Sequence, residues 1–222
     1  MYGKLFIVAT PIGNLEDITY RALETLRSVD FVLCEDTRVT KKLLDHYTIS
    51  TPTKTYHHHS GDAVMREMGN LLGDGNNLAL VSDAGTPGIS DPGNLLIEYL
   101  QTNYPEVEIV PIGGISAVTT ALSVSGFATD KFIFLGFIPQ KNKRKQFFEE
   151  IHEAKYTVAF FESSHRIEKT IKEMQEYLEK DRKVCICREL TKKFESIYRG
   201  TIADLATLKI NTKGEFVILI KK

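Results

Sequence analysis

The sequence has no tryptophan and only three cysteines, Cys34, Cys185 and Cys187. Their number is odd and no Cys-x-x-Cys pair occurs, so the pattern does not indicate a disulfide framework. Free cysteines that are buried and reduced are typical of proteins from a reducing compartment. We therefore expect all three thiols to be buried and reduced.

Long apolar runs are also missing. No apolar stretch approaches the roughly 18 residues needed to cross a bilayer. The N-terminal segment MYGKLFIVATP contains one short apolar run, which proline, glycine and acidic residues follow at once, unlike a signal peptide. Hydrophobic residues make up 42% of the chain, which is enough for an ordinary core. The sequence thus predicts a soluble, cytoplasmic protein with one large or two small domains.

Two common phosphate-binding motifs are absent as well. No Gly-Lys-Ser/Thr of a Walker loop is present, and no Gly-x-Gly-x-x-Gly. The chain instead carries SDAGTPGISDPG (82–93), between a predicted strand at 78–82 and a helix expected to begin near Ser90-Asp91-Pro92. Its glycines allow the backbone to approach a ligand closely. The alternative is a long capped turn with no ligand.

Two other glycine- and proline-bearing turns follow predicted strands. ATPIGNL (9–15) follows the strand at 4–9, and PIGGISA (111–117) follows the strand at 107–111. In open α/β sheets, ligands bind beyond the carboxyl ends of the strands. We therefore expect the three loops to converge on one nucleotide-like ligand.

Strands and helices alternate in the first half of the chain, which predicts an α/β fold with a mostly parallel sheet. Asp17 is expected to cap the first helix. The later part is richer in strands, which predicts a mixed sheet. We expect two α/β domains, residues 1–111 and 112–222. The predicted strands lie at 4–9, 31–34, 53–56, 78–82, 107–111, 131–137, 156–162, 183–187, 195–200 and 214–220.

Charge is divided unevenly between these halves. Residues 1–111 hold 8 basic and 15 acidic residues, whereas residues 112–222 hold 20 and 14, giving net charges of −7 and +6. A basic half can attract a polyanion, although uneven surface charge without a partner is the alternative. KNKRK (141–145), extended by Lys192, Lys193 and Arg199, is a candidate phosphate track. Phe137, Phe147 and Phe148 are nearby aromatics that could stack on bases, with core packing as the default.

A family resemblance covers the chain from Leu5 to about Leu219. The ordered motifs that carry it are ATPIGNL, CEDTR, YHHHS, VSDAGTPGISDPG, PIGGISA, FLGFIP, FFESSHR, CRELTKKFESIYRGT and KGEF. This order resembles the tetrapyrrole methylase superfamily, and within it the branch that methylates ribosomal RNA. The resemblance implies two α/β domains that enclose S-adenosylmethionine in a cleft, a homodimer, and 2′-O-methylation of a cytidine ribose in small-subunit (16S) ribosomal RNA.

The sequence departs from the family pattern in three places. Gly113-Gly114-Ile115-Ser116 replaces a Pro-Gly-Pro-Ser turn, which makes this loop more flexible. Ser164 stands where the family has proline. Relatives often carry a small C-terminal helical domain, whereas this chain ends at Lys222 soon after its last predicted strand, which weakens the inference about the exact RNA target.

The resemblance also implies a set of cofactor contacts. The glycine-rich loop (82–93) supplies six of the twelve. Other loops supply Pro11, Ser116, Ala117 and Phe161, and the second domain supplies Leu190 and Gly214. Asp83 could accept a hydrogen bond from a ligand hydroxyl or amine, or could organise an Asx turn instead. The full set is Pro11, Asp83, Gly85, Thr86, Pro87, Ile89, Ser90, Ser116, Ala117, Phe161, Leu190 and Gly214.

A ribose hydroxyl is a poor nucleophile, so a base or a cation that stabilises the alkoxide is expected near it. Glu162 and His165 are the candidate proton handlers, and Arg166 and Arg188 the candidate phosphate or alkoxide contacts. Surface ion pairs or helix caps are the alternative roles, with Ser163 or Ser164 capping a helix that His165 begins. Candidate substrate contacts are Asp36, Arg38, His57, Lys192 and Lys193.

No metal is expected. His57, His58 and His59 are adjacent, and neighbouring residues on a strand alternate faces, so they make a poor chelate. His57 or His59 is expected at the rim of the cleft instead.

Two other functions compete with RNA methylation. One is methylation of a precorrin-type tetrapyrrole, and the other is binding of RNA or a nucleotide without catalysis. CEDTR, ESSHR and the basic second half favour RNA.

Overall fold

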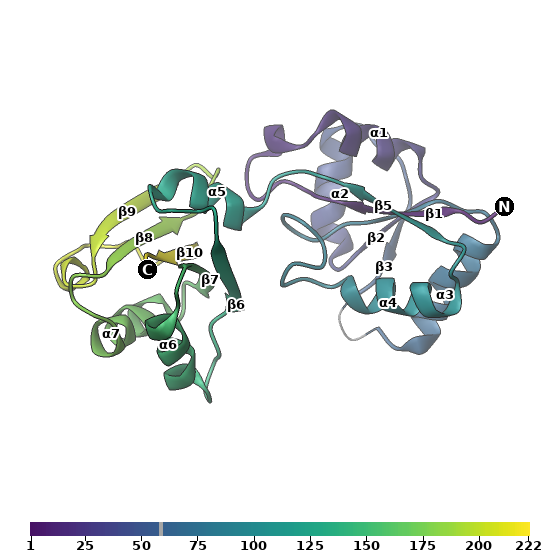
Figure 1. The fold of residues 1–222 in the computed structure, drawn as a ribbon. Coiled ribbons are helices and arrows are strands. Elements are labelled where there is room, and N and C mark those ends of the chain that lie inside the picture. The colour runs from purple at the N-terminus through teal and green to yellow at the C-terminus, as the bar shows by residue number, and fades with distance from the viewer. Residues whose placement is uncertain (58–59) are drawn as a thin grey trace. The chain divides into compact units, whose positions relative to one another are not determined.

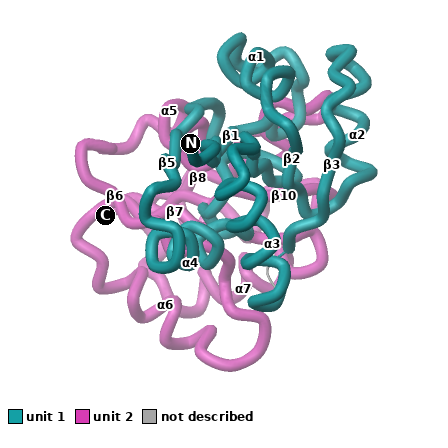
Figure 2. Tube along the Cα trace, turned by 90° about the vertical axis from the view of Figure 1, so that its right-hand side faces the viewer, with its two compact units in different colours: residues 1–116 teal, residues 117–222 magenta. Residues whose placement is uncertain are grey.

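The computed structural model describes residues 1–57 and 60–222, and the chain divides into two compact units, residues 1–116 and 117–222 (Figures 1 and 2). Each unit has its own five-stranded sheet and its own core. The structural division falls after Ser116, whereas the sequence suggested residue 111. The last strand of the first sheet, β5 (Glu108–Ile112), extends past that point and pairs with β1.

The first sheet is parallel in every pairing, with the strand order β3-β2-β4-β1-β5. This confirms the prediction of a mostly parallel N-terminal sheet. The run FVLC forms a strand because Val32 and Cys34 pack on one face and Leu33 packs on the other. The other strands of the sheet are β1 (Lys4–Val8), β2 (Phe31–Cys34), β3 (Thr53–Thr55) and β4 (Leu78–Leu80).

Helices cover both faces of this sheet (Figure 1). On one face, α1 (Tyr20–Ser28) and α2 (Thr37–His46) bury Leu26 and Leu44 against the strands. On the other, α3 (Asp62–Gly73) and α4 (Asn94–Asn103) bury Leu72 and Leu96. A short 3-10 helix, η1 (Leu15–Asp17), precedes α1.

Two helix starts differ from the sequence-based expectation. Thr19, not Asp17, caps α1, because its hydroxyl accepts a hydrogen bond from the backbone N–H of Ala22 at 3.1 Å. The helix expected near Ser90 begins only at Asn94, after Gly93 with φ of +145°. The segment SDAGTPGISDPG is therefore loop throughout, and its backbone is left free to shape a site.

The second unit contains a mixed sheet, as predicted, with the order β6-β7-β10-β8-β9. Only β6 and β7 pair in parallel, and the other neighbours are antiparallel. α6 (Arg144–Glu153) and α7 (Ile167–Tyr177) pack on one face, around Phe148 and Phe160, and α5 (Ala117–Ser125) contacts β10 and β7. The strands are β6 (Phe132–Phe137), β7 (Thr157–Ser163), β8 (Lys183–Arg188), β9 (Ser196–Thr201) and β10 (Glu215–Ile220), with the 3-10 helix η2 (Asp204–Ala206) after β9.

The three cysteines are free thiols and buried, which confirms the expectation for them. Among the residues that the structure describes, no helix is long and apolar enough to cross a membrane.

Candidate functional site

Three loops of the first unit leave the carboxyl ends of β4, β1 and β5, which are neighbours in the sheet. The loops after β1 and β4 are joined by an isolated bridge, in which Thr10 and Gly85 exchange backbone N–H···O hydrogen bonds of 2.9 and 3.0 Å. The hydroxyl of Thr10 also donates to the carbonyl of Ser82 at 3.0 Å. Because the strands are parallel, their loops meet at one edge of the sheet, as predicted from the sequence.

Glycines shape this loop cluster in two ways. Gly85 and Gly88 both have φ of +83°, a left-handed conformation that side chains rarely adopt. A Cβ added to Gly88 would meet no atom within 4 Å, so open space lies beside this backbone. At Gly114 the reverse holds, since a Cβ there would lie 2.9 Å from Cβ of Ala9. This glycine allows the loop after β5 to pack against β1.

Ser90 has φ of +60° although it is not a glycine. Such a conformation costs of order 1–3 kcal/mol and is common at ligand sites. Ser90, Gly88 and Asp91 line a concavity of about 450 Å³ together with Glu35. The glycine-rich loop thus combines strained backbone with open space, which is the arrangement that a ligand contacted by backbone groups requires.

Acidic side chains surround this loop. Burial, and then the nearby carboxylates of Glu35 and Asp83, raise the pKa of Asp91 to about 6. Asp36 has the opposite shift, since hydrogen bonds from Arg38 lower its pKa to about 2. Asp36 caps α2 through the backbone N–H of Arg38 at 2.8 Å and holds the Arg38 guanidinium at 2.7 Å. The two predicted substrate contacts are therefore one ion pair at the start of α2.

A cavity of about 270 Å³ lies between the loops after β1 and β4 and helix α2. Leu15, Val39 and Leu43 give it an apolar wall. Asp83 is exposed, and its carboxylate accepts a hydrogen bond from the backbone N–H of Asp36 at 3.4 Å. The other residues that line the cavity are Thr10, Pro11, Thr40, Lys42 and Ser82.

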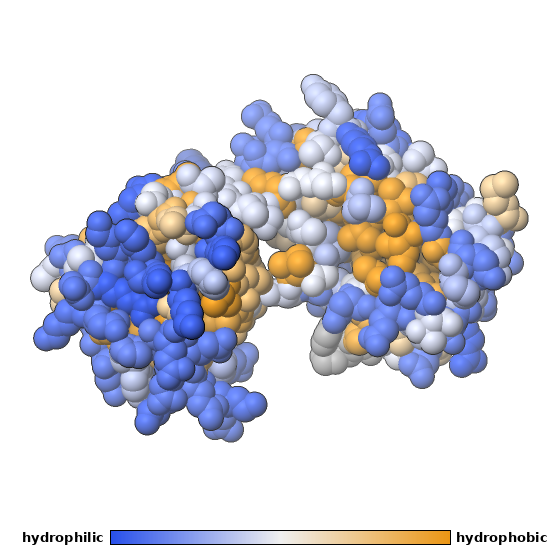
Figure 3. Space-filling model, viewed as in Figure 1, coloured by the Kyte–Doolittle hydropathy of each residue, from blue (hydrophilic) through white to orange (hydrophobic). Residues whose placement is uncertain are grey.

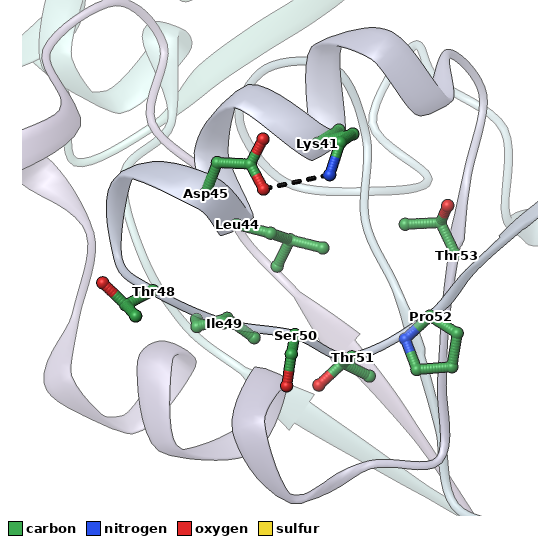
Figure 4. Close-up of a pocket in the computed structure, with 9 residues that line it drawn as sticks. All are labelled: Lys41, Leu44, Asp45, Thr48, Ile49, Ser50, Thr51, Pro52 and Thr53. Carbon is green, nitrogen blue, oxygen red and sulfur yellow. Dashed lines mark hydrogen bonds and ion pairs between the residues drawn. The ribbon is translucent and has the colours of Figure 1, made fainter.

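A third concavity, of about 510 Å³, lies at the other end of α2 (Figure 4). The segment Thr48–Thr53 forms much of its lining, and Lys41 and Asp45 on α2 form an ion pair of 3.1 Å across one side. It adjoins the start of β3, which is the amino end of the parallel sheet. No residue predicted to contact cofactor or substrate lines it, so we do not assign it to the site.

In the second unit, Glu162 is 1% exposed and sits among four partners. Its carboxylate accepts hydrogen bonds from the Thr170 hydroxyl at 2.6 Å and the Ser163 N–H at 2.7 Å, and it pairs with the Arg166 guanidinium at 2.8 Å. Arg144, 5% exposed, lies 3.9 Å away and also pairs with Glu173. The acceptor sites of Glu162 are thus occupied by this buried network, which favours a positioning role over proton transfer.

Arg166 and His165 lie in the turn that joins β7 to α7. Arg166 donates to the Ile138 carbonyl at 3.0 Å and to the Ser163 hydroxyl at 3.1 Å. Neither Ser163 nor Ser164 caps the helix, because α7 begins at Ile167 with Arg166 at the N-cap and without a side-chain cap. His165 is exposed.

The loop after β8 is strained on both sides of Leu190. Glu189 and Thr191 have φ of +51° and +65°, and a β-branched residue such as Thr191 is a clear outlier there. Arg188, 6% exposed, holds this region by donating to the carbonyls of Lys213 at 2.5 Å and Phe194 at 2.7 Å. Leu190 is therefore fixed in a defined place.

Three predicted cofactor contacts of the second unit gather at one end of its sheet. Val217 on β10 pairs with Phe161 on β7, and Phe216 pairs with Arg188 at the end of β8. Gly214 immediately precedes β10 with φ of +115°, and a Cβ there would lie 2.5 Å from Cγ of Glu189. The sheet register thus brings Phe161, Leu190 and Gly214 to the same end.

The candidate phosphate track is only partly available. Arg144 is buried, which removes it from KNKRK, and Arg199 donates to the Val124 carbonyl at 2.5 Å. Lys192 is held between Glu189 and Glu215, at 3.1 and 2.7 Å. The remaining exposed lysines of the track are Lys141, Lys143, Lys145 and Lys193.

Of the aromatic side chains near this track, some are buried in the core and others are exposed. Phe147 and Phe148 belong to the core, as the default interpretation held. Phe137, the last residue of β6, is 54% exposed beside Phe161. Figure 3 shows apolar side chains on the surface of the second unit. Phe194 is 64% exposed, and the Lys193 ammonium lies 5.7 Å from its ring. Lys193 and Phe194 thus form an exposed cation–aromatic pair.

Comparison with known proteins identifies the family. The model of the Tetrapyrrole (Corrin/Porphyrin) Methylases matches residues 4–206. The chain belongs to this family of tetrapyrrole methylases. Ribosomal RNA small subunit methyltransferase I of Synechocystis sp. is 45% identical over 221 residues, covering 98% of this chain and 78% of that protein. The proteins of the same name from Haemophilus influenzae and Vibrio cholerae are 45% and 47% identical, covering 99% and 97% of this chain and 78% and 76% of those proteins.

Solved structures of tetrapyrrole methylases and related enzymes share the fold. Diphthine synthase superposes with a TM-score of 0.73 at 13% identity, covering 99% of this chain and 90% of that chain. Uroporphyrin-III C-methyl transferase from Thermus thermophilus, complexed with S-adenyl homocysteine, superposes with a TM-score of 0.65 at 15% identity, covering 98% and 97%. At these identities the likeness concerns the fold alone. The resemblance drawn from the motifs and the predicted fold class are both confirmed.

In this member of the family, the structure brings some predicted site residues together within each unit. Pro11 and the loop from Asp83 to Ser90 adjoin in the first unit, and Ser116 ends the neighbouring loop after β5. Ala117 begins α5 in the second unit. His57 is exposed, and its backbone N–H donates to Ser60 at 3.0 Å. His58 and His59 lie outside the described residues.

Sequence reasoning missed the apolar wall of the 270 Å³ cavity. Val39 and Leu43 are four residues apart on α2, so they share a helix face. That spacing was the available signal, but in a single sequence it is indistinguishable from core packing.

Proposed function

We propose that this chain transfers the methyl group of S-adenosylmethionine to the 2′-hydroxyl of a cytidine ribose in small-subunit ribosomal RNA. The observation that carries the proposal is 45–47% identity, over 97–99% of the chain, to several proteins named ribosomal RNA small subunit methyltransferase I. The motifs by which the sequence resembles the family include the three strand-end loops described above. Methylation of a tetrapyrrole has only the match to the broad family and the shared fold in its favour.

The loops of the first unit fit a cofactor that is bound through backbone N–H and C=O groups. Gly85 and Gly88 expose peptide groups beside open space, and Ser90 is held in a strained conformation next to them. S-adenosylmethionine supplies an electrophilic methyl group on a positively charged sulfur. The residues proposed to hold it are Pro11, Gly85, Thr86, Pro87, Ile89, Ser90, Ser116 and Ala117, with Phe161, Leu190 and Gly214 as predicted contacts of the second unit.

Proton transfer from the ribose hydroxyl is assigned to His165. Its imidazole is exposed, and a neutral imidazole has one ring nitrogen that can accept a proton. Glu162 is fully occupied by Arg166, Ser163 and Thr170, so we propose that it holds Arg166 and the turn in place. Arg188 likewise fixes the loop that carries Leu190.

The second unit is proposed to bind the RNA backbone. It carries the whole positive excess of the chain, a net charge of +6. Exposed lysines contact phosphates without reading sequence, so they orient the RNA. Lys141, Lys143 and Lys193 are the proposed contacts.

We also propose that the protein is cytoplasmic, where ribosomal subunits are modified, and that it is a homodimer. Light scattering coupled to size-exclusion chromatography tests the dimer directly. A mass equal to one chain of 25.1 kDa would overturn it.

The decisive experiment incubates the purified protein with tritiated S-adenosylmethionine and small ribosomal subunits from cells that lack the gene. We expect tritium in the ribosomal RNA, and mass spectrometry of the digested RNA should locate it on one cytidine ribose. Precorrin-type tetrapyrroles serve as competing substrates. Transfer to these and not to RNA would overturn the proposal, and failure to bind S-adenosylmethionine in calorimetry would favour a non-catalytic module.

A further inference from the structure

The 270 Å³ cavity of the first unit lies beside the loops proposed to hold the cofactor. It opens between Pro11 and Asp83 on the loops and Val39 on α2. Pockets for drug-sized ligands have volumes of roughly 300–1,000 Å³. The cavity is therefore of a size for a fragment such as a single nucleobase. All its lining residues belong to residues 1–116, so its shape is set by one unit.

Most polar groups of the cavity are already satisfied by the protein. The Ser82 hydroxyl donates within its own loop at 3.2 Å, and the Thr10 hydroxyl donates to the Ser82 carbonyl. Two charged groups keep hydrogen-bonding capacity. The Asp83 carboxylate receives one long hydrogen bond, from Asp36, and no ion pair of Lys42 occurs in the part of the chain that the structure describes. The cavity thus offers an apolar slot with one strong acceptor and one donor.

We propose that this cavity receives the cytosine base of the acceptor nucleotide, turned out of its stack, and that Asp83 selects cytosine over uracil. The inference rests on the proposed function. A carboxylate only accepts hydrogen bonds, and the exocyclic amino group of cytosine donates them. Uracil carries a carbonyl oxygen at the same ring position, which a carboxylate repels. Lys42 supplies a donor for the remaining carbonyl oxygen of the base.

Charge argues for a base over a phosphate in this cavity. The first unit has a net charge of −7, and Glu35, Asp36 and Asp91 lie close to Asp83. An RNA phosphate is repelled there, whereas a neutral base with an amino group is attracted. Enzymes that act on a base read the extruded base through its Watson–Crick edge and through apolar walls. We infer the same mode of holding for a nucleotide that is methylated on its ribose, with Pro11, Leu15 and Val39 as the apolar walls.

Asp83 then contacts the acceptor base and not the cofactor, and the substitution Asp83→Asn tests this. An amide both donates and accepts, so the variant loses the charge and tolerates a carbonyl oxygen. We expect kcat/KM for small subunits with the native target cytidine to fall by about 10- to 100-fold. Subunits reconstituted with uridine at that position should gain activity relative to cytidine, while the Kd for S-adenosylmethionine stays unchanged in calorimetry.

Asp45→Asn is the matched control. Asp45 is an exposed carboxylate on the same unit and lines the 510 Å³ concavity (Figure 4). Its loss should change neither the rate of methyl transfer nor the preference for cytidine. Val39→Trp fills the cavity from an exposed position, and we expect it to abolish methyl transfer without altering cofactor binding. Leu208→Trp is the control for bulk, because Leu208 is similarly exposed on the second unit. We expect this variant to transfer methyl groups and to bind the cofactor like the wild type.

Each outcome has a distinct meaning. If Asp83→Asn weakens S-adenosylmethionine binding as much as it slows methyl transfer, Asp83 serves the cofactor and the inference is wrong. An unchanged preference for cytidine, or full activity of Val39→Trp, also overturns it. If the wild-type protein methylates no small-subunit RNA, the proposed function fails and the inference falls with it.

Discussion

Thr10 and Gly85 exchange two backbone hydrogen bonds, although they lie on different loops after different strands. This pair closes the carboxyl end of the first sheet between β1 and β4. Gly85 adopts φ of +83° in the pair, so its place in the site depends on the absence of a side chain. The bridge also fixes Pro11 next to the glycine-rich loop.

Replacing Gly85 with alanine should weaken cofactor binding. A left-handed conformation costs a residue with a side chain roughly 1–2 kcal/mol, and the new Cβ would lie 3.4 Å from the Ile12 side chain. We expect a loss of about that size in the free energy of unfolding, with a 10-fold or larger rise in the Kd for S-adenosylmethionine as the loop shifts. Gly61→Ala is the control, because a Cβ there meets nothing within 4 Å. Equal binding by both variants would contradict the prediction.

Replacing Glu162 with alanine should destabilise the second unit. The change leaves Arg166 and the buried Arg144 without their shared carboxylate, and removing one partner of a buried ion pair costs about 3–5 kcal/mol. Urea unfolding followed by circular dichroism measures this loss. Glu149→Ala, which breaks an exposed pair with Lys145, should cost less than about 1 kcal/mol. A Glu162→Ala protein as stable as the wild type would contradict the prediction.

Asp91 should make the protein less stable as the pH rises. Because the pKa of Asp91 is about 6 in the folded protein and 3.8 is its ordinary value, the folded state binds more protons between these two values. The free energy of unfolding therefore falls as pH increases through this window, and the penalty is fully present above about pH 6. The substitution Asp91→Asn removes this penalty on the free energy of unfolding.

Thermal melts at pH 4 and pH 7.5 test this prediction. The variant should melt at a higher temperature than the wild type at pH 7.5, and the gap should narrow at pH 4. A gap that is the same at both pH values would mean that the carboxyl group titrates normally.

Lys141 and Lys143 should contribute to the salt dependence of RNA binding. Each lysine that neutralises a phosphate releases counterions, so the double variant Lys141→Ala/Lys143→Ala should reduce the slope of log K against log salt by about 1–2. Filter binding of small-subunit RNA at several potassium chloride concentrations gives the slope. Lys180→Ala, an exposed lysine outside the track, should leave it unchanged. Identical slopes for the double variant and the wild type would remove the track from the RNA interface.

The strands were largely predictable because buried β-rich runs sit between strong turn signals. FVLC at 31–34 is a strand with the bounds that the sequence indicated. Helix starts were less predictable, since Asp17 and Thr19 are both good capping residues two positions apart. The structure favours Thr19, whose hydroxyl lies 3.5 Å from the Gly113 carbonyl, a contact with a loop 94 residues away.

The roles of charged residues were the least predictable part of the site. Arg144 stands among four other polar or basic residues in KNKRK, and nothing local distinguishes it. Its partners Thr170 and Glu173 are 26 and 29 residues away, on α7. Only the packing of α6 against α7 buries it.

The sequence by itself determined the family, the two kinds of sheet and the loops that follow β1, β4 and β5, because turn residues and apolar runs act locally along the chain. Tertiary structure alone decided which charged side chains are buried and paired inside the protein, such as Glu162 and Arg144. It also decided which charged side chains stay exposed and can contact a ligand, such as Asp83 and Lys193. The reason is physical: a charge is neutralised by whichever partner lies within a few ångströms, and that partner is set by the packing of distant segments.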